Sequence, residues 1–459
     1  MSNRYLYITL LTLLGFSTEA TAQATQQAPQ LVVSIAVEQL RTDRLEAYAP
    51  LYHHTWGLKR LMEEGLVYPH GGYNFIPVDR ASATASLMTG TSPFYHGITG
   101  SEWLNRQTLR PQSSVTDQQH LMTPQQLATS TLADELKIRT NGQAKVFAFA
   151  IDAECAILSA GHAADGAAWL LGSQWQMASY YTPVNQWLSL YTLQNKPVGD
   201  INSSLTEMAL RCVEQSGIGQ DSFTDLLSIS YKIEPDEVGY QMLDRYLSDL
   251  ISGVHRRLPA DKVLFVITGL GTQEEEEHEE ENKRFHIPTG KFYINRTANL
   301  LNMYLGAIYG SATYVETSYR NQLFLNRQLI DKKNINRGDL LRQAQEFLLQ
   351  MSGVRNVYTA TQLLTSDSPL LQRVRNGFYA EKSGDLLIEV APGWELVNED
   401  SHYSSVSRIS YIPFPVFFFG AGIKAQCIQT PVTVDRIAPT IARIIRIRAP
   451  NACEAEPLF

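Results

Sequence analysis

The sequence predicts an α/β fold, with a doubly wound, mostly parallel central sheet and helices on both of its faces. Continuous apolar runs rich in β-branched residues recur along the chain, which is typical of strands buried on both faces of a parallel sheet. Segments with a helical spacing of apolar residues separate these runs. Such alternation indicates βαβ units, and a chain of 459 residues is long enough to bury their core.

Five segments have the composition of buried strands. They are LVVSIAVEQL (31–40), KVFAFAI (145–151), DLLSISY (225–231), KVLFVITGLG (262–271) and FPVFFFGAG (414–422). Ligands of open α/β sheets bind at the carboxyl ends of the strands. The residues that directly follow these segments, together with the turn around Arg80, are therefore the candidate functional positions.

Four segments have the pattern of helices. They are HTWGLKRLMEEGLV (54–67), RASATASLMTG (80–90), YQMLDRYLSDLISGVHRRL (240–258) and NINRGDLLRQAQEFLLQM (334–351). Because no repeat or Pro/Ser-rich linker divides the body, we expect one domain at 31–459 after a short segment at 23–30, with insertions at about 165–200 and 272–330. The aromatic stretch 169–187 is expected in the core or a lid, with an exposed contact patch as the alternative.

The N-terminus predicts export. An Arg precedes an apolar run, and Ala20, Thr21 and Ala22 then offer a cleavage site, so residues 1–22 have the layout of a secretory signal peptide. The alternative, a membrane anchor, is disfavoured because the run is shorter than the ~20 residues of a span. No Cys follows the run to carry a lipid, and we expect no transmembrane span after signal removal. The mature protein is expected in the periplasm or at a membrane surface of the cell envelope.

An exported chain meets oxidising conditions, in which its four cysteines can form up to two disulfides. Their spacing favours a disulfide between Cys427 and Cys453, whereas Cys155 and Cys212 are expected to be buried thiols. Neither a CxxC motif nor Cys/His ligand spacing occurs, which argues against a structural zinc site.

The formal net charge of -8 argues against a nucleic-acid partner, because no basic excess exists to neutralise phosphates. The stretch EEEEHEEEN at 274–282 is compositionally unusual. We expect a solvated loop there, as for other blocks of like charge, and keep cation binding as the alternative.

Several motifs carry a resemblance to a known family. They are VVSIAVEQLRTDRL, GLKRLMEEGLVYPHGGYNFIP, ATASLMTGTSPFYHGITGSEW, AILSAGHAADGAAWL, RFHIPTGKFYINRTANLLNMYLGAIYG and TPVTVDRIAPTIARII. From about residue 30 to 459 the chain resembles the alkaline phosphatase superfamily, near the type I phosphodiesterase branch, and most of all its periplasmic phosphatases with a Thr nucleophile. The resemblance implies two zinc ions held by Asp and His, with basic and amide side chains on the phosphoryl oxygens.

The first half of the implied site is altered. The first metal carboxylate of the family falls on Glu38 in VEQLR. The nucleophilic Thr falls on Arg80, and the His usually found four residues later is Thr84. The phosphate-contacting Asn falls on Ser101 in GSEW.

The second half departs further. The Lys and Arg of the family fall on Asp152 and Glu154 in DAECAILSAGH, so both charges are reversed. A metal-binding Asp is retained as Asp236, whereas the following His is Tyr240.

The remaining ligand positions are occupied by Gly269 and Leu270, in place of an Asp-His pair, and by Pro413, in place of the last His. Residues of these types do not bind zinc. Of the six zinc-ligand positions, Asp236 is retained, Glu38 can coordinate, and four are lost, so we expect no catalytic residue, no metal and no cofactor at the carried-over positions.

We hypothesise that Arg80 forms ion pairs with some of the surrounding acids, and the alternative is an unpaired surface residue. A substitute nucleophile among Ser82, Thr84 and Ser86 would need an activating base. His96 and His162 are the candidates, and packing or helix capping is the role that we favour for both.

Three functional interpretations follow. The first is a catalytically inactive, exported alkaline-phosphatase-like scaffold, which binds a protein partner as a subunit of a cell-envelope or outer-membrane complex. The second is a periplasmic binding protein for a cationic or neutral small ligand, because Asp152 and Glu154 would repel a phosphoryl group. The third is a hydrolase with a rebuilt site.

Overall fold

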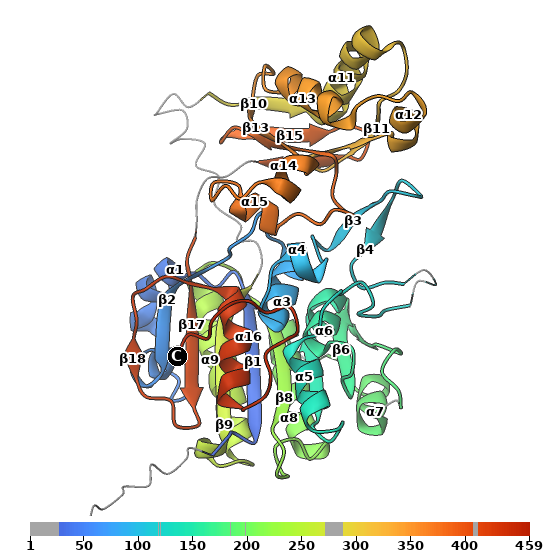
Figure 1. The fold of residues 1–459 in the computed structure, drawn as a ribbon. Helices are drawn as coiled ribbons and strands as arrows, with labels where there is room; N and C mark the ends of the chain where they lie inside the picture. The colour runs from blue at the N-terminus through green and yellow to red at the C-terminus, as the bar shows by residue number, and fades with distance from the viewer. Residues whose placement is uncertain are drawn as a thin grey trace, which may run out of the picture.

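The computed structural model of the chain describes residues 27–459 except 118, 120, 184, 198, 271–287 and 407–411. It is an α/β fold in which helices flank both faces of a mixed, mostly parallel central sheet (Figure 1). The predicted fold class is therefore confirmed. The proposed signal peptide and the Glu-rich stretch 274–282 lie outside the described residues.

The central sheet is built around β1 (Leu31–Glu38), which is buried along its whole length. On one side of β1, from the edge inward, lie β18 (Gln426–Cys427), β2 (Leu66–Gly72), β17 (Phe414–Gly420) and β9 (Val263–Leu270), with β19 (Val432–Thr433) also beside β2. On its other side, from β1 outward, lie β8 (Asp225–Lys232), β5 (Val146–Ala150), β6 (Gly166–Leu171) and β7 (Gln174–Met177). β1 pairs in parallel with β8 and β9, and its last residue Glu38 lies opposite Lys232 and Leu270. Hence the carboxyl ends of these three strands share one edge of the sheet.

Two hydrophobic clusters fix the helices on the two faces of the sheet. One face carries α3 (Arg80–Thr89), α5 (Leu132–Arg139), α6 (Ala153–Ala160) and α16 (Ile437–Ile444), and the other carries α2 (Leu58–Glu64), α7 (Gln186–Gln194), α8 (Ile201–Gln215) and α9 (Glu237–His255). Short elements at the carboxyl edge are α1 (Thr42–Ala47), α4 (Pro93–His96) and the hairpin of β3 (Glu102–Asn105) and β4 (Arg110–Ser113). The sheet therefore has both faces covered, as its apolar strands require.

The helix expected at 54–67 is shorter than predicted. α2 covers only Leu58–Glu64, because Gly57 and Gly65 flank it in extended conformations and the next residues enter β2. An apolar residue at Leu66 continues the helical spacing by chance, but it is the first residue of β2. The aromatic stretch 169–187 packs as the core interpretation predicts, with Trp187 against Phe147 at a ring distance of 5.6 Å.

A second lobe extends beyond the carboxyl edge of the sheet (Figure 1). It contains β10 (Gly290–Tyr293), α11 (Ile294–Tyr309), β11 (Val315–Tyr319), β12 (Gln322–Leu325), α12 (Arg327–Lys332), α13 (Arg337–Leu348), β13 (Val354–Thr359), α14 (Ala360–Thr365), α15 (Gln372–Asn376), β14 (Leu386–Val390), β15 (Trp394–Asn398) and β16 (Tyr403–Val406). Its strands form two small sheets with a hydrophobic core of their own. The insertion expected at about 272–330 overlaps the first part of this lobe.

The predicted disulfide between Cys427 and Cys453 is not formed in the structure, in which all four cysteines are free. The Cys427 sulfur accepts a hydrogen bond from Gln429 Nε2 at 3.2 Å on an exposed edge strand, whereas Cys453 lies beside the Gly90 turn. Cys155 and Cys212 are buried, as expected. Among the described residues, no helix combines the length and apolar content that crossing a membrane requires.

Candidate functional site

Arg80 is the first residue of α3 and lies at the carboxyl edge of the sheet. The helix begins there because Asp79 caps it: the Asp79 side chain accepts a hydrogen bond from the Ser82 amide at 3.0 Å, and Ser82 completes a capping box. The other oxygen of Asp79 accepts from the Ser101 amide at 2.6 Å. This capping holds the segment before Arg80 against the turn that follows α4, and so fixes where the guanidinium emerges.

The Arg80 guanidinium forms the ion pairs that we hypothesised. Nη1 lies 2.9 Å from Asp152 Oδ2 and 3.8 Å from Glu38 Oε2. The Arg80 side chain is 38% exposed, whereas those of Glu38 and Asp152 are 8% and 18% exposed, so the guanidinium lies over the more buried acids. We call this cluster, together with the neighbouring Glu154, the Arg80 site. Burial lowers the pKa of Arg80, but the charges of Asp152 and Glu38 outweigh burial and leave its pKa raised. The guanidinium is therefore always charged.

Asp152 and Glu154 stand at the start of α6, which follows β5. Asp152 caps this helix by accepting a hydrogen bond from the Cys155 amide at 2.8 Å while it holds Arg80. Burial, followed by the adjacent charge of Asp152, raises the pKa of Glu154 from 4.5 to about 7. A carboxyl group that is half ionised near neutral pH is suited to general acid–base chemistry.

Three other predicted positions have local structural roles. Thr84 Oγ1 donates back to the Arg80 carbonyl at 2.8 Å, which occupies its hydroxyl within α3. The Ser101 amide donates to Asp79, the residue that caps α3. Asp236 is exposed and caps α9 by accepting from the Gly239 amide at 2.8 Å. No ion pair between Asp236 and Arg80 is found in the described part of the chain.

The last four predicted positions are filled by packing. The buried Tyr240 hydroxyl accepts from the Arg41 amide at 2.7 Å and donates to the Gln39 carbonyl at 3.0 Å. A side chain at Gly269 would meet Phe414 at 2.5 Å, and Leu270 is 3% exposed. The Pro413 carbonyl accepts from the Thr42 amide at 3.0 Å.

The two zinc ions that the resemblance implies do not fit these residues. In the described ranges, no group of three or more His, Cys, Asp or Glu side chains is placed to hold a metal ion. Glu38 and Asp152 face a guanidinium, and the histidine positions of the family hold Thr84, Tyr240, Leu270 and Pro413. The described residues therefore provide no zinc-dependent reaction step.

Ser86 and His96 lie 2.9 Å apart between Oγ and Nε2, and both are fully buried. His96 Nδ1 accepts a hydrogen bond from the Ile98 amide at 3.1 Å, so the ring proton must be on Nε2. Nε2–H then donates to Ser86 Oγ, so Nε2 has no lone pair with which to accept the Ser86 hydroxyl proton. Burial, and then the charge of Lys382, lower the pKa of His96 to about 3. The pair is structural, as we favoured from the sequence.

Ser86→Ala is expected to lower the free energy of unfolding by about 1–2 kcal/mol, because it leaves the buried His96 Nε2–H group without an acceptor. Urea denaturation followed by circular dichroism measures this loss. Ser252→Ala, at a half-buried helical serine whose hydroxyl hydrogen bond is solvent-exposed, is the control and should change stability by less than about 0.5 kcal/mol. An equal, small effect for both variants would contradict the buried hydrogen bond.

His162 is also structural. Its Nδ1 lies 2.8 Å from Asp134 Oδ2, and its Nε2 lies 3.2 Å from the Leu127 carbonyl. The hydrogen bond to Asp134 is the main cause that raises the pKa of His162. This arrangement ties the start of α5 to the end of α6 and leaves neither ring nitrogen for a nucleophile.

Arg320 is a candidate that sequence reasoning missed. It lies in the turn between β11 and β12 of the second lobe, with a positive φ of 48°. Its Nη1 lies 3.9 Å from Asp79 Oδ2, and its Nη2 lies 3.8 Å from Glu102 Oε1. Arg320 thus places a second guanidinium beside the residue that precedes Arg80. The positive φ could have been guessed from the turn sequence, but the approach to Asp79 could not.

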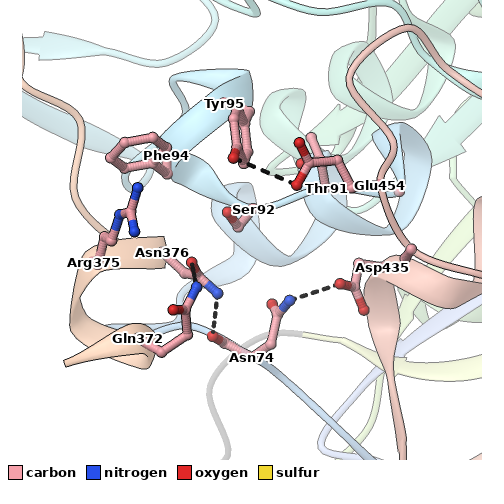
Figure 2. Close-up of a pocket in the computed structure, with 12 residues that line it drawn as sticks. Asn74, Thr91, Ser92, Phe94, Tyr95, Gln372, Arg375, Asn376, Asp435 and Glu454 are labelled. Carbon is pink, nitrogen blue, oxygen red and sulfur yellow. Dashed lines mark hydrogen bonds between the residues drawn. The ribbon is translucent and has the colours of Figure 1, made fainter. Parts of the chain in front are cut away.

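A polar cavity of about 180 Å³ lies beyond the other end of α3, between α4, α15 and the C-terminal segment (Figure 2). Asn74 Nδ2 donates to Asp435 Oδ2 at 2.6 Å, and Asn376 Nδ2 donates to the Asn74 carbonyl at 2.9 Å. Burial raises the pKa of Asp435. Because Asn74 belongs to the segment that leads from β2 to Arg80, these bonds hold that segment in place. We interpret the hydrogen bonds around this cavity as structural support for the Arg80 site.

Comparison with known proteins relates the chain to a family of phosphodiesterases and to proteins named alkaline phosphatases. Residues 32–409 match the family described as type I phosphodiesterase / nucleotide pyrophosphatase. A protein of Myroides odoratus named calcium-transporting ATPase is 24% identical and covers 96% of this chain and 96% of its own length. Alkaline phosphatase PafA of Elizabethkingia meningoseptica is 22% identical, with 94% of both chains covered. Alkaline phosphatase PhoV of Synechococcus elongatus is 24% identical over 92% of this chain and 91% of that protein.

The crystal structure of PafA matches this structure with a TM-score of 0.79 at 21% identity, and covers 94% of this chain and 98% of that chain. This likeness establishes the fold. It also shows that the second lobe belongs to an arrangement shared over nearly the whole length of both chains.

These comparisons correct the expectation of an inactive scaffold. Relatives that span more than nine-tenths of the chain are named alkaline phosphatases, and the matching family is one of phosphodiesterases. They point to a phosphatase or phosphodiesterase function. The pseudoenzyme interpretation, its emphasis on an absence of zinc, and the binding-protein alternative are therefore not retained.

Proposed function

The chain belongs to the type I phosphodiesterase / nucleotide pyrophosphatase family, and on this premise we propose that it hydrolyses phosphodiesters at the Arg80 site, with Arg80, Asp152 and Glu154 as the acting residues. The observation that carries the proposal is a guanidinium held by Asp152 in the same cluster as Glu154, a carboxyl group whose pKa is about 7, at the carboxyl edge of the sheet. Family membership and the names of the relatives support hydrolysis of a phosphoester.

Each residue has a defined part in the proposed reaction. Arg80 binds the non-bridging phosphoryl oxygens, and Asp152 holds the guanidinium in place. Ionised Glu154 takes a proton from a water molecule, whose oxygen forms a new bond to phosphorus as the bond to the leaving oxygen breaks. The products are a phosphomonoester and an alcohol, and the leaving oxygen takes its proton from solvent.

The charge of the Arg80 site favours diesters over monoesters. One guanidinium lies near the carboxyl groups of Glu38 and Asp152, and Glu154 adds a third carboxyl group beside Asp152. A diester carries one negative charge at neutral pH, whereas a monoester carries close to two, because its second pKa is about 6. Repulsion from the acids therefore penalises the monoester more.

A substrate panel tests the proposal. The purified full chain should hydrolyse bis(4-nitrophenyl) phosphate with a kcat/KM at least about tenfold above that for 4-nitrophenyl phosphate, a difference of ~1.4 kcal/mol in the barrier. Arg80→Ala protein from the same host serves as the control for contaminating phosphatases. Equal rates for wild type and Arg80→Ala on both substrates would overturn the proposal.

Arg320→Ala is expected to raise KM for the diester roughly three- to tenfold with little change in kcat. Arg320 lies near Asp79 and not near Arg80 itself. Its positive charge therefore attracts the substrate toward the Arg80 site but does not act on the bond that breaks. Arg342→Ala, which removes an exposed charge from α13 of the same lobe, is the matched control. A fall in kcat with unchanged KM would contradict this role.

Export is part of the proposal. It is supported by the signal-peptide layout of residues 1–22, which lie outside the described residues. The envelope partner expected from the sequence stays a prediction.

A further inference from the structure

A cavity of about 520 Å³, larger than the polar cavity near α4, lies at the opposite edge of the sheet from the Arg80 site. Leu66 in its wall pairs with Phe418 of β17, which in turn pairs with Val266 near the start of β9, so the cavity lies at the amino edge of the central strands. α16 and the segment that follows it form the other wall. A volume of roughly 300–1,000 Å³ is the usual range of small-molecule sites.

The wall of this cavity has both polar and apolar groups, and the apolar surface is the larger share. Leu66 and Tyr68 of β2 line it from the sheet, and Ile423, Ile444 and Leu458 complete the apolar wall. Tyr68 is 3% exposed, and its ring packs edge-on against that of Phe418, with 6.5 Å between the ring centroids. The buried Tyr68 hydroxyl has no hydrogen-bond partner among the described residues.

The charged side chains of the cavity all have one sign. Lys424, Arg443 and Arg446 line it, and none of the lining residues that the structure describes has an acidic side chain. Within the same described ranges, neither Lys424 nor Arg443 forms an ion pair, and both are exposed. This local excess of positive charge is unusual in a chain with a net charge of -8, and it complements an anion.

We propose that this cavity binds a single-chain amphiphile with an anionic head group, of the class of a medium-chain fatty acid. The hydrocarbon chain would occupy the apolar space between Leu66 and Ile444, and the carboxylate would lie at Lys424 and Arg443. Apolar burial then supplies affinity, and the two cations supply the choice of head group. This cavity is separate from the Arg80 site, and the proposal does not depend on the proposed hydrolase function.

Displacement of 11-(dansylamino)undecanoate from the full chain by dodecanoate, below its micelle concentration, tests the site. We expect saturable, one-to-one binding. The double variant Lys424→Ala/Arg443→Ala should weaken dodecanoate binding roughly tenfold or more, which is ~1.4 kcal/mol, and leave the binding of uncharged dodecanol unchanged. Ile444→Trp, which fills the cavity, should abolish both. Circular dichroism confirms that each variant is folded.

Arg342→Ala, an exposed charge in the second lobe, is the matched control and should bind as wild type does. Equal affinity for dodecanoate and dodecyltrimethylammonium would overturn the proposal, as would undiminished dodecanoate binding by the double variant. Binding to anionic phospholipid vesicles without binding of monomeric dodecanoate would also overturn it, since the surface would then be a membrane contact.

Discussion

Glu154→Gln should lower kcat/KM for a phosphodiester by roughly 10²–10⁴-fold, the range that loss of a general base typically costs. The glutamine keeps the size and the hydrogen-bonding capacity of the side chain but cannot take a proton from water. Because Arg80 and Asp152 are untouched, substrate binding should be nearly unchanged, and the loss should fall on kcat. Steady-state kinetics with bis(4-nitrophenyl) phosphate at pH 8 measures it.

The same substitution should stabilise the protein at that pH. The folded-state pKa of Glu154 is raised from 4.5 to about 7, mainly by burial, so folded protein binds this proton more tightly than unfolded protein does. The ionised side chain therefore destabilises the fold progressively as the pH rises from about 4.5 to 7. Glu154→Gln removes that penalty, and its melting temperature should exceed that of wild type at pH 8 but not at pH 4.

Glu207→Gln, at an exposed carboxyl of α8, is the matched control and should alter neither activity nor stability appreciably. A Glu154→Gln protein with wild-type kcat would remove Glu154 from the proposed reaction. A Glu154→Gln protein that melts below wild type at pH 8 would contradict the raised pKa.

The second large effect concerns the attachment of the second lobe. Asp385 is 2% exposed, and its carboxylate accepts hydrogen bonds from Arg106 at 3.0 Å, from Arg327 at 3.0 and 2.7 Å, and from the Leu325 amide at 2.8 Å. Arg106 belongs to the β3–β4 hairpin of the core domain, whereas the other partners belong to the lobe. The carboxylate is thus the shared partner of two parts of the fold.

Asp385→Ala is expected to destabilise the protein by roughly 3–5 kcal/mol, because it leaves the largely buried Arg106 guanidinium without its counter-charge. Urea denaturation followed by circular dichroism measures the change, and hydrogen exchange should show that protection is lost first in the lobe. Asp367→Ala, which removes a fully exposed carboxylate of the same lobe, should cost less than about 0.5 kcal/mol. A loss below about 1 kcal/mol for Asp385→Ala would contradict the shared role of the carboxylate.

The central sheet could be predicted because its strands are buried on both faces, so their composition alone distinguishes them. β1, β8 and β9 begin and end within one or two residues of the expected positions. The second lobe gives no such signal, since its strands have only four to six residues and one exposed face or edge. α2 was predicted too long because Leu66 fits a helical spacing and a strand equally well.

The location of the candidate site could also be predicted, but not its meaning. The motif positions brought Glu38, Arg80 and Asp152 together, since each follows a parallel strand or begins the helix after one. The approach of Arg320 to Asp79 depends on contacts between residues 241 positions apart, which one sequence does not reveal. The inference from altered charges to inactivity was wrong, because residue changes at motif positions do not show what the new residues do together.

The pH dependence of kcat/KM for bis(4-nitrophenyl) phosphate, measured on the full chain from pH 5 to 9, tests the central claim most directly. Because the ionised form of Glu154 is the base, kcat/KM should rise through about pH 7 and level off above it. Hydrolysis no faster than that by the Arg80→Ala control at every pH, or a rate that does not change between pH 5 and 9, would contradict it.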